Sequence, residues 1–198
     1  MAAHLEPAPA GLVLLTGGSS SRFGAPKHLQ AHPEGGSWAY FLVRLFRQVL
    51  GEGPVRILGE PVAECPDLPR IDDPREGPAR ALSRWAAAET QSVRRWWVVA
   101  CDQVRWNPAS LAAWHEAARQ ADPSGQAWVM PEILGELQPL GGFLGGELLS
   151  HLGRSTERRM LVLAGSMPNL SLPWEAEPFL DLDDAEAVAA WLRERRSS

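Results

Sequence analysis

The chain has 198 residues, of which 45% are hydrophobic and 22% charged, and its formal net charge at pH 7 is −5. This length and composition are typical of a globular protein with a substantial core, so we expect one domain over residues 1–198 with frayed ends at 1–10 and 196–198. Because nucleic acids and membrane surfaces both attract basic proteins, the acidic balance argues against either of them as a partner.

Hydrophobic periodicity predicts strands and helices that alternate along the chain. Short apolar runs predict buried strands, and apolar residues at helical spacing predict helices, two of them capped by Ser37 and Asn107. In chain order we expect a strand at 11–16, a helix at 37–50, a strand at 54–58, an extended piece at 69–71, a helix at 77–89, a strand at 95–100, a helix at 107–121, a strand at 126–130, helices at 144–152 and 156–164, a short strand ending at Leu180, and a helix from Asp183 or Asp184 to Arg195.

This order predicts an α/β fold with an open, mostly parallel sheet and helices on both faces. The nine tryptophans are scattered without periodicity, so we expect most of them to fill the core. In such sheets ligands bind beyond the carboxyl ends of the strands. Those ends carry a glycine-rich segment and several carboxylates, which predict a ligand site at this edge: residues 14–27, Asp72, Asp73, Asp102, Asp181 and Asp183.

The glycine-rich segment LLTGGSSSRFGAPK occupies residues 14–27, directly behind the first strand. Gly17 and Gly18 can adopt positive φ, which lets backbone N–H groups approach an anion closely. Arg22 and Lys27 add charges that complement phosphate. The spacing fits neither a Walker A loop nor a dinucleotide-binding fingerprint. The segment therefore predicts a phosphate-binding loop, with a plain surface loop as the alternative.

Asp102 follows the apolar run that ends at Ala100. A carboxylate in that position can reach Mg²⁺, an ion that is usually held by one or two carboxylates together with substrate phosphates. The alternative is that Asp102 caps the next helix, a role for which Asn107 is better placed.

The segment LTGGSSSRFGAPK resembles the L-A-G-G-x-S-x-R-M-G-x-D-K signature of the molybdenum cofactor guanylyltransferase (MobA-like) family, within the nucleotidyltransferase superfamily. Further segments resemble the later motifs of that family, in the same order and over nearly the whole chain: RIDDPREGPARAL, VVACDQV, QPLGGFL, STERRMLV and FLDLDDAEAV. The resemblance implies a three-layer, Rossmann-like enzyme that uses Mg²⁺ to transfer GMP from GTP to molybdopterin and releases pyrophosphate.

The resemblance also implies roles for individual residues. Leu15, Thr16 and Gly17 would face the base and ribose, Asp73 or Asp72 would bind the guanosine side, and Lys27 the phosphates. Gly18, Arg22 and Gly24 would shape the phosphate loop. The implied catalytic residues are Arg22, Lys27 and Asp102. Asp102 would hold Mg²⁺, with Asp183 as a second candidate ligand where the family has asparagine.

The chain departs from the family pattern at several turns, namely at Pro26, Ala81, Val104, Asp181 and Asp183. These departures leave three functions open. The first is guanylyl transfer to molybdopterin, which the double glycine favours because the cytidine-specific branch resembles A-A-G there. The second is nucleotidyl transfer to another acceptor, by cytidylyl transfer to molybdopterin or with a sugar or alcohol phosphate. The third is an inactive nucleotide-binding relative.

Partners and location follow from the same considerations. The resemblance implies GTP and molybdopterin as substrates, with transient contacts to other cofactor-biosynthesis proteins. The first ten residues, MAAHLEPAPA, lack the basic and apolar regions of a signal peptide, and no apolar run approaches the roughly 18 residues of a membrane span. We therefore expect a cytoplasmic protein.

Overall fold

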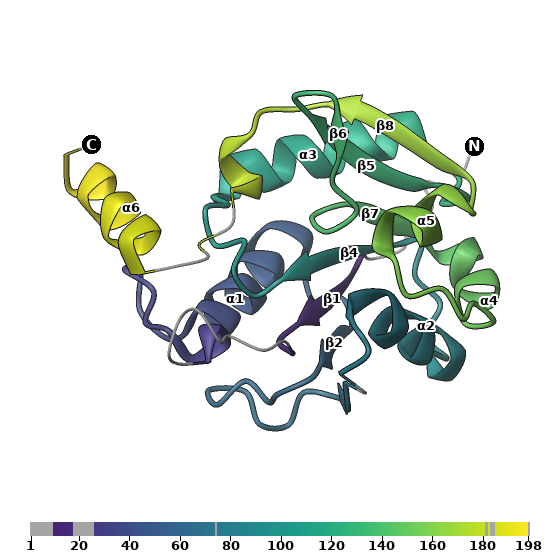
Figure 1. The fold of residues 1–198 in the computed structure, drawn as a ribbon, viewed down its shortest axis with the longest axis horizontal. Helices are drawn as coiled ribbons and strands as arrows, with labels where there is room; N and C mark the ends of the chain where they lie inside the picture. Colours follow the sequence, from purple (N-terminus) through teal and green to yellow (C-terminus); the bar gives the residue numbers. More distant parts are fainter. Residues whose placement is uncertain (1–9, 18–25, 74, 181, 183–184, 198) are drawn as a thin grey trace, which may run out of the picture.

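A computed structural model describes residues 10–17, 26–73, 75–180, 182 and 185–197. Its strands form one eight-stranded sheet (Figure 1). They are β1 (Gly11–Leu15), β2 (Val55–Leu58), β3 (Arg70–Ile71), β4 (Arg95–Ala100), β5 (Trp128–Ile133), β6 (Glu136–Leu137), β7 (Phe143–Gly145) and β8 (Asn169–Pro173). The helices are α1 (Trp38–Leu50), α2 (Pro78–Ala88), α3 (Pro108–Ala121), α4 (Leu149–Leu152), α5 (Met160–Gly165) and α6 (Ala185–Ser197), and the 3₁₀ turns are η1 (Lys27–Leu29), η2 (Gly146–Leu148) and η3 (Glu177–Phe179).

The strand order is β3-β2-β1-β4-β7-β5-β6, with β8 paired to β5. β1 pairs in parallel with both β2 and β4, and β2 pairs in parallel with β3. β7 is antiparallel to both β4 and β5, while β8 is parallel to β5. The carboxyl ends of β1 to β4 therefore meet at one edge of the sheet, which confirms the predicted α/β class with a mostly parallel sheet.

The sheet separates two hydrophobic cores because side chains alternate along a strand. In β1, Leu12 and Leu14 point into the core that contains α1 and α3, whereas Val13 and Leu15 point into the core that contains α2, α4 and α5. Trp96 and Trp97 of β4 divide between the two cores in the same way. Seven of the nine tryptophans are fully buried, so their expected role as core residues is confirmed.

The predicted caps are present on two of the helices. The Ser37 hydroxyl accepts a hydrogen bond from the Tyr40 amide at 3.2 Å and begins α1. Asn107 begins α3, where its side chain accepts from the Ser110 amide at 2.9 Å and the Ser110 hydroxyl accepts from the Asn107 amide at 3.0 Å. These reciprocal bonds satisfy amide groups that lack a partner inside the helix.

The prediction of a helix at 144–152 is wrong over its first half. Leu144 lies in β7, where it pairs with Trp96 and Trp128, and only 149–152 form an α-helix. Gly145 and Gly146 lie close to other backbone segments. A Cβ on Gly145 would overlap the carbonyl oxygen of Gly125, and a Cβ on Gly146 would overlap that of Val93. Apolar spacing alone could not separate a buried strand that leads into a short helix from one longer helix.

Two other predicted elements also differ from the structure. The helix expected at 156–164 begins only at Met160. The strand expected to end at Leu180 is wrong, because Glu177–Phe179 form the turn η3, in which the Phe179 ring packs edge-on against Trp106 at 4.7 Å between centroids. The strand of this region lies earlier, at Asn169–Pro173, and is fixed by its parallel pairing with β5.

The C-terminal helix α6 packs against the segment between η1 and α1. Trp191 of α6 lies 5.4 Å from the ring of His32, which stacks on Phe41 of α1 at 3.6 Å. Arg195 of α6 pairs with Glu34 at 3.0 Å. His32 is only 4% exposed, and burial lowers the pKa of His32 to about 4, with the Glu34 carboxylate opposing that shift.

The buried His32 predicts an acid-sensitive stability. A histidine with a lowered pKa in the folded state stabilises the fold fully above its unfolded pKa, about 6.5, and this stability is lost as the pH falls toward 4. From pH 7 to pH 5 we expect His32 to account for about 2 kcal/mol of lost unfolding free energy. Urea denaturation at both pH values measures it.

The matched variant for this experiment is His32→Phe, which keeps an aromatic ring but cannot be protonated. The pKa of His115 is also lowered to about 4 by burial, so the wild type and the variant share that second contribution. The pH-dependent loss should be smaller in His32→Phe than in the wild type. Equal losses in the two proteins would show that His32 does not carry the effect.

Candidate active site

A pocket of about 810 Å³ lies at the carboxyl edge of the parallel strands, where the sequence predicts the ligand site. A volume of this size is within the range of small-molecule sites. All but one of the lining residues come from the ends of β1 to β4 and the segments that follow them; Leu140 comes from the turn between β6 and β7. The lining residues are Leu15, Thr16, Gly17, Lys27, Gly59, Glu60, Arg70, Asp72, Asp73, Arg75, Gly77, Pro78, Ala100, Cys101, Asp102 and Leu140.

Gly17 and Asp73 meet at the end of β1. A Cβ on Gly17 would overlap the carboxylate oxygen Oδ2 of Asp73, so a side chain at this position cannot fit without displacing the acid. The other oxygen of Asp73, Oδ1, accepts a hydrogen bond from the Arg75 amide at 2.8 Å. Asp72 instead pairs with Arg70 at 2.9 Å, and its side chain is 83% exposed. Of the two acids, Asp73 is the one held beside the first loop.

Thr16 and Gly59 join the end of β1 to the end of β2. The Thr16 hydroxyl donates to the carbonyl oxygens of Glu60 at 2.7 Å and Leu58 at 3.3 Å. Gly59 has φ of +117°, and a Cβ there would overlap the backbone nitrogen of Gly17. The two turns are therefore in close backbone contact, which only glycine at position 59 permits.

Lys27 and Asp102 form an ion pair inside the pocket. Lys27 Nζ lies 2.9 Å from Asp102 Oδ2, and both side chains are largely buried, at 15% and 19% exposure. Lys27 comes from η1, after the glycine-rich segment, and Asp102 follows β4. The pair places a cation and a hard oxygen donor side by side, an arrangement suited to a phosphate–metal complex.

Burial shifts the pKa of two neighbouring groups, Cys101 and His28, toward the uncharged form. Burial raises the pKa of the Cys101 thiol to about 12, and the negative charge of Asp102 adds to that effect. Cys101 therefore remains a thiol and has no role as a nucleophile at neutral pH. Burial lowers the pKa of His28, an effect that Glu60 partly offsets, so His28 favours the uncharged imidazole.

The structure brings together most of the residues singled out from the sequence. Those lining the pocket are Leu15, Thr16, Gly17, Lys27, Asp72, Asp73 and Asp102. Gly18, Arg22, Gly24, Asp181 and Asp183 lie outside the described residues.

Sequence reasoning did not single out Glu60, Arg70, Arg75 or Leu140 as lining residues. Glu60 comes two residues after β2, so its place beyond a strand end was available as a signal. Leu140 carried no such signal, because it lies in the turn between β6 and β7 and not after a parallel strand.

Three of the departures from the family pattern, at Pro26, Ala81 and Val104, lie in the described residues and are compatible with the fold. Pro26 precedes η1, and its carbonyl oxygen accepts the Leu29 amide at 3.2 Å. Ala81 is a buried residue within α2, where alanine favours the helix more than glycine would. Val104 is fully buried in the core beside α1 and α3.

The residues that could hold a metal ion are few. Among the described residues, no three His, Cys, Asp or Glu side chains are grouped as a metal site. Asp102 nevertheless fits Mg²⁺, because this ion needs only one or two protein carboxylates when substrate phosphates and waters complete its shell.

In the part of the chain that the structure covers, no helix has the length and apolar character needed to cross a membrane.

The fold is that of an α/β protein with a pocket at the carboxyl edge of its parallel strands, where ligands bind in such sheets. A model of the family described as "MobA-like NTP transferase domain" matches residues 12–170. The chain therefore belongs to the MobA-like NTP transferase family. No curated protein matches the chain at a significant level.

Solved structures share the fold at low sequence identity. The molybdopterin-guanine dinucleotide biosynthesis protein A from Archaeoglobus fulgidus has 14% identity and a TM-score of 0.71, with 95% of this chain and all of that chain covered. Rv0371c from Mycobacterium tuberculosis, in complex with manganese, has 16% identity and a TM-score of 0.63, covering 94% and 99%. A 4-diphosphocytidyl-2C-methyl-D-erythritol synthase has 11% identity and a TM-score of 0.62, covering 95% and 98%.

Proposed function

We propose that this nucleotidyltransferase transfers GMP from GTP to molybdopterin and releases pyrophosphate. The observation that carries the proposal is the ion pair of Lys27 and Asp102, 2.9 Å apart, in the pocket of a MobA-like domain. The double glycine at Gly17 and Gly18 supports guanine rather than cytosine as the base. Retention of the lysine and the aspartate together argues against an inactive relative.

In the proposed reaction, a phosphate oxygen of molybdopterin attacks the α-phosphorus of GTP in line. The bond between that phosphorus and the oxygen bridging to the β-phosphate breaks, and pyrophosphate leaves with the bonding electrons. The acceptor phosphate is already ionised, so no general base is required. Catalysis then consists mainly of positioning and of charge stabilisation.

Four described residues of the site have a part in this reaction. Lys27 binds the triphosphate and offsets the charge that grows on the leaving pyrophosphate. Gly17 and Asp73, which lie against each other, bound the nucleoside side of the pocket. Asp102 would hold Mg²⁺. When bound, that ion neutralises the phosphate oxygens and helps to align them for displacement.

Lys27 also positions Asp102 in this site. Because its ammonium group donates to Oδ2 of Asp102 at 2.9 Å, it holds that carboxylate in place in the pocket before substrate enters. The exposed Arg158, whose backbone lies just beyond the Gly77 edge of the pocket, is suited to meet the acceptor phosphate, and Arg159 follows it in the chain.

A pyrophosphate-release assay tests the proposal with each of GTP, CTP, ATP and UTP, together with Mg²⁺ and molybdopterin. We expect release with GTP that exceeds release with the other three nucleotides, and a rate at least about a hundredfold lower in Asp102→Asn. Release with CTP instead would assign the chain to cytidylyl transfer. Release with GTP only when molybdopterin is replaced by a sugar or alcohol phosphate would identify another acceptor. Nucleotide binding without release on any acceptor would indicate an inactive relative.

A further inference from the structure

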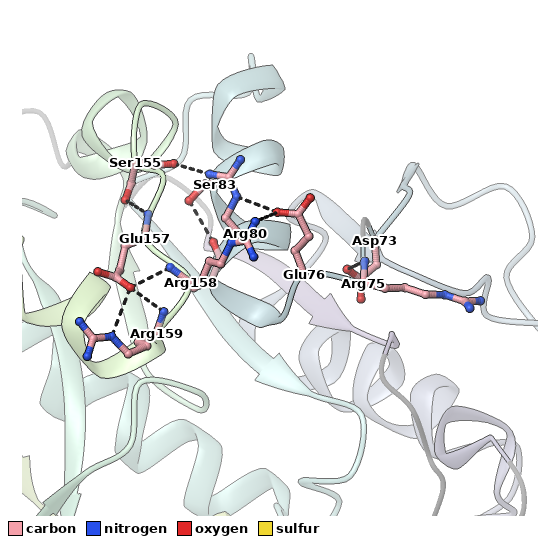
Figure 2. Close-up of polar contacts among 10 residues, drawn as sticks. Asp73, Arg75, Glu76, Arg80, Ser83, Ser155, Glu157, Arg158 and Arg159 are labelled. Carbon is pink, nitrogen blue, oxygen red and sulfur yellow. Dashed lines mark hydrogen bonds and ion pairs between the residues drawn. The ribbon is translucent and has the colours of Figure 1, made fainter.

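The segment from Ser155 to Arg159, between α4 and α5, lies against the start of α2 (Figure 2). It carries two exposed arginine side chains, Arg158 at 72% and Arg159 at 77%. Its backbone folds around the Glu157 carboxylate, which accepts hydrogen bonds from the backbone amides of Arg158 at 2.8 Å and Arg159 at 2.9 Å. This segment therefore presents two cations from a defined backbone.

Arg80 of α2 joins this segment to the rest of the protein. Its Nη1 donates to the Ser155 carbonyl oxygen at 2.7 Å. Its Nε lies 3.5 Å from Glu76 Oε2, and the same carboxylate oxygen lies 3.4 Å from Arg158 Nη2. Figure 2 shows two guanidinium groups, that of Arg80 from the helix and that of Arg158 from the segment, directed at the Glu76 carboxylate. The Arg80 side chain is only 23% exposed, so these contacts are partly shielded from water.

The same contacts reach the edge of the pocket. Glu76 lies between Arg75 and Gly77, both of which line the pocket, whereas Arg80 does not. Gly77 turns the chain into α2 with φ of +94°, and a Cβ there would lie 3.9 Å from the Arg158 carbonyl oxygen. The Arg75 amide is bonded to Asp73, which lies against Gly17. A continuous set of contacts thus connects the arginine segment with the nucleotide pocket.

We propose that Arg80 is a positioning residue for the second substrate. Through Ser155 and Glu76 it holds Arg158 at the Gly77 edge of the pocket, where the acceptor would bring its anionic phosphate. The proposal rests on the proposed nucleotidyl transfer and adds the residue that orients the acceptor side. An arginine suits this position, because a planar guanidinium can donate to the Ser155 carbonyl and contact the Glu76 carboxylate at the same time.

The substitution to test is Arg80→Ala, with Arg80→Lys as the conservative variant and Arg84→Ala as the matched control. Arg84 is an exposed arginine one turn further along α2 and does not line the pocket. In the pyrophosphate-release assay, Arg80→Ala should raise the KM for molybdopterin about tenfold, as expected for loss of a charge-assisted hydrogen bond. The KM for GTP should stay within about twofold. Arg80→Lys should recover part of the loss, and Arg84→Ala should match the wild type.

An unchanged KM for molybdopterin, or an equal rise in the KM for GTP, would overturn the positioning role. If the wild type releases no pyrophosphate with molybdopterin, the proposed acceptor is wrong, and inorganic phosphate becomes the probe. Calorimetric titration of phosphate into each protein saturated with MgGTP then makes the same comparison. Weaker phosphate binding in Arg80→Ala than in Arg84→Ala would support the proposal, and equal binding would overturn it.

Discussion

Replacing Asp102 with asparagine is expected to lower kcat/KM for nucleotidyl transfer by two to three orders of magnitude, roughly the cost of losing one group that stabilises transition-state charge. The amide keeps the size of the side chain but removes the negative charge beside Lys27. Steady-state kinetics with saturating Mg²⁺ measure the effect. Thermal denaturation should show a smaller effect than the kinetics, because the asparagine oxygen can still accept a hydrogen bond from Lys27.

A binding measurement separates a role in metal binding from a general defect. In EDTA, the affinity of Asp102→Asn for GTP should be no lower than that of the wild type, because a carboxylate that repels the triphosphate is gone. In Mg²⁺, the variant should lack the gain in affinity that the wild type shows. Asp67→Asn, an exposed aspartate outside the pocket, is the matched control and should behave as the wild type. The same Mg²⁺-dependent gain in both proteins would contradict the assignment of Asp102.

Replacing Gly59 with alanine is expected to impair both folding and nucleotide binding. The positive φ of +117° costs about 1–3 kcal/mol in a residue with a side chain. The added Cβ would also overlap the Gly17 backbone nitrogen, which cannot move without shifting the loop after β1. We expect a lower melting temperature and an affinity for GTP reduced by about tenfold or more. Differential scanning calorimetry and calorimetric titration measure the two effects.

Gly135→Ala provides the control for the conformational part of this effect. Gly135 also has positive φ, +85°, but nothing lies within 4 Å of the Cβ that alanine would add. It sits in the turn between β5 and β6, outside the pocket. Gly135→Ala should lower the melting temperature without weakening GTP binding. If both variants bound GTP as the wild type does, close contact between the turns after β1 and β2 would not matter for the site.

The parallel half of the fold could be predicted because its signals are local. The apolar runs of β1 and β4 are short and bounded, and Ser37 and Asn107 precede α1 and α3 with the hydrogen-bonding side chains that caps require. The region after β5 was harder to predict. β6 and β8 are edge elements whose pairing with β5 depends on residues far along the chain, and β7 is inserted between β4 and β5.

The site divides in a similar way. The sequence shows that Lys27 follows a glycine-rich loop and that Asp73 and Asp102 follow strand ends. Because parallel strands bring their carboxyl ends to one edge, these residues were expected to lie close together. The choice between Asp72 and Asp73 was not, since it depends on which side chain turns toward Gly17. The contact of Arg80 with Ser155 was also not predictable, because it joins residues 75 positions apart.

The sequence by itself therefore determined the class of fold, the edge of the sheet that carries the pocket and the residue types gathered there. These follow from periodicity, capping and strand order, which are properties of neighbouring residues. Only the tertiary structure decided the pairing of Lys27 with Asp102, the fit of Gly59 against Gly17 and the link from Arg80 to the arginine segment. Each of these depends on the distance between side chains or backbone groups that are remote in the chain, and that distance is set only when the two cores pack against the sheet.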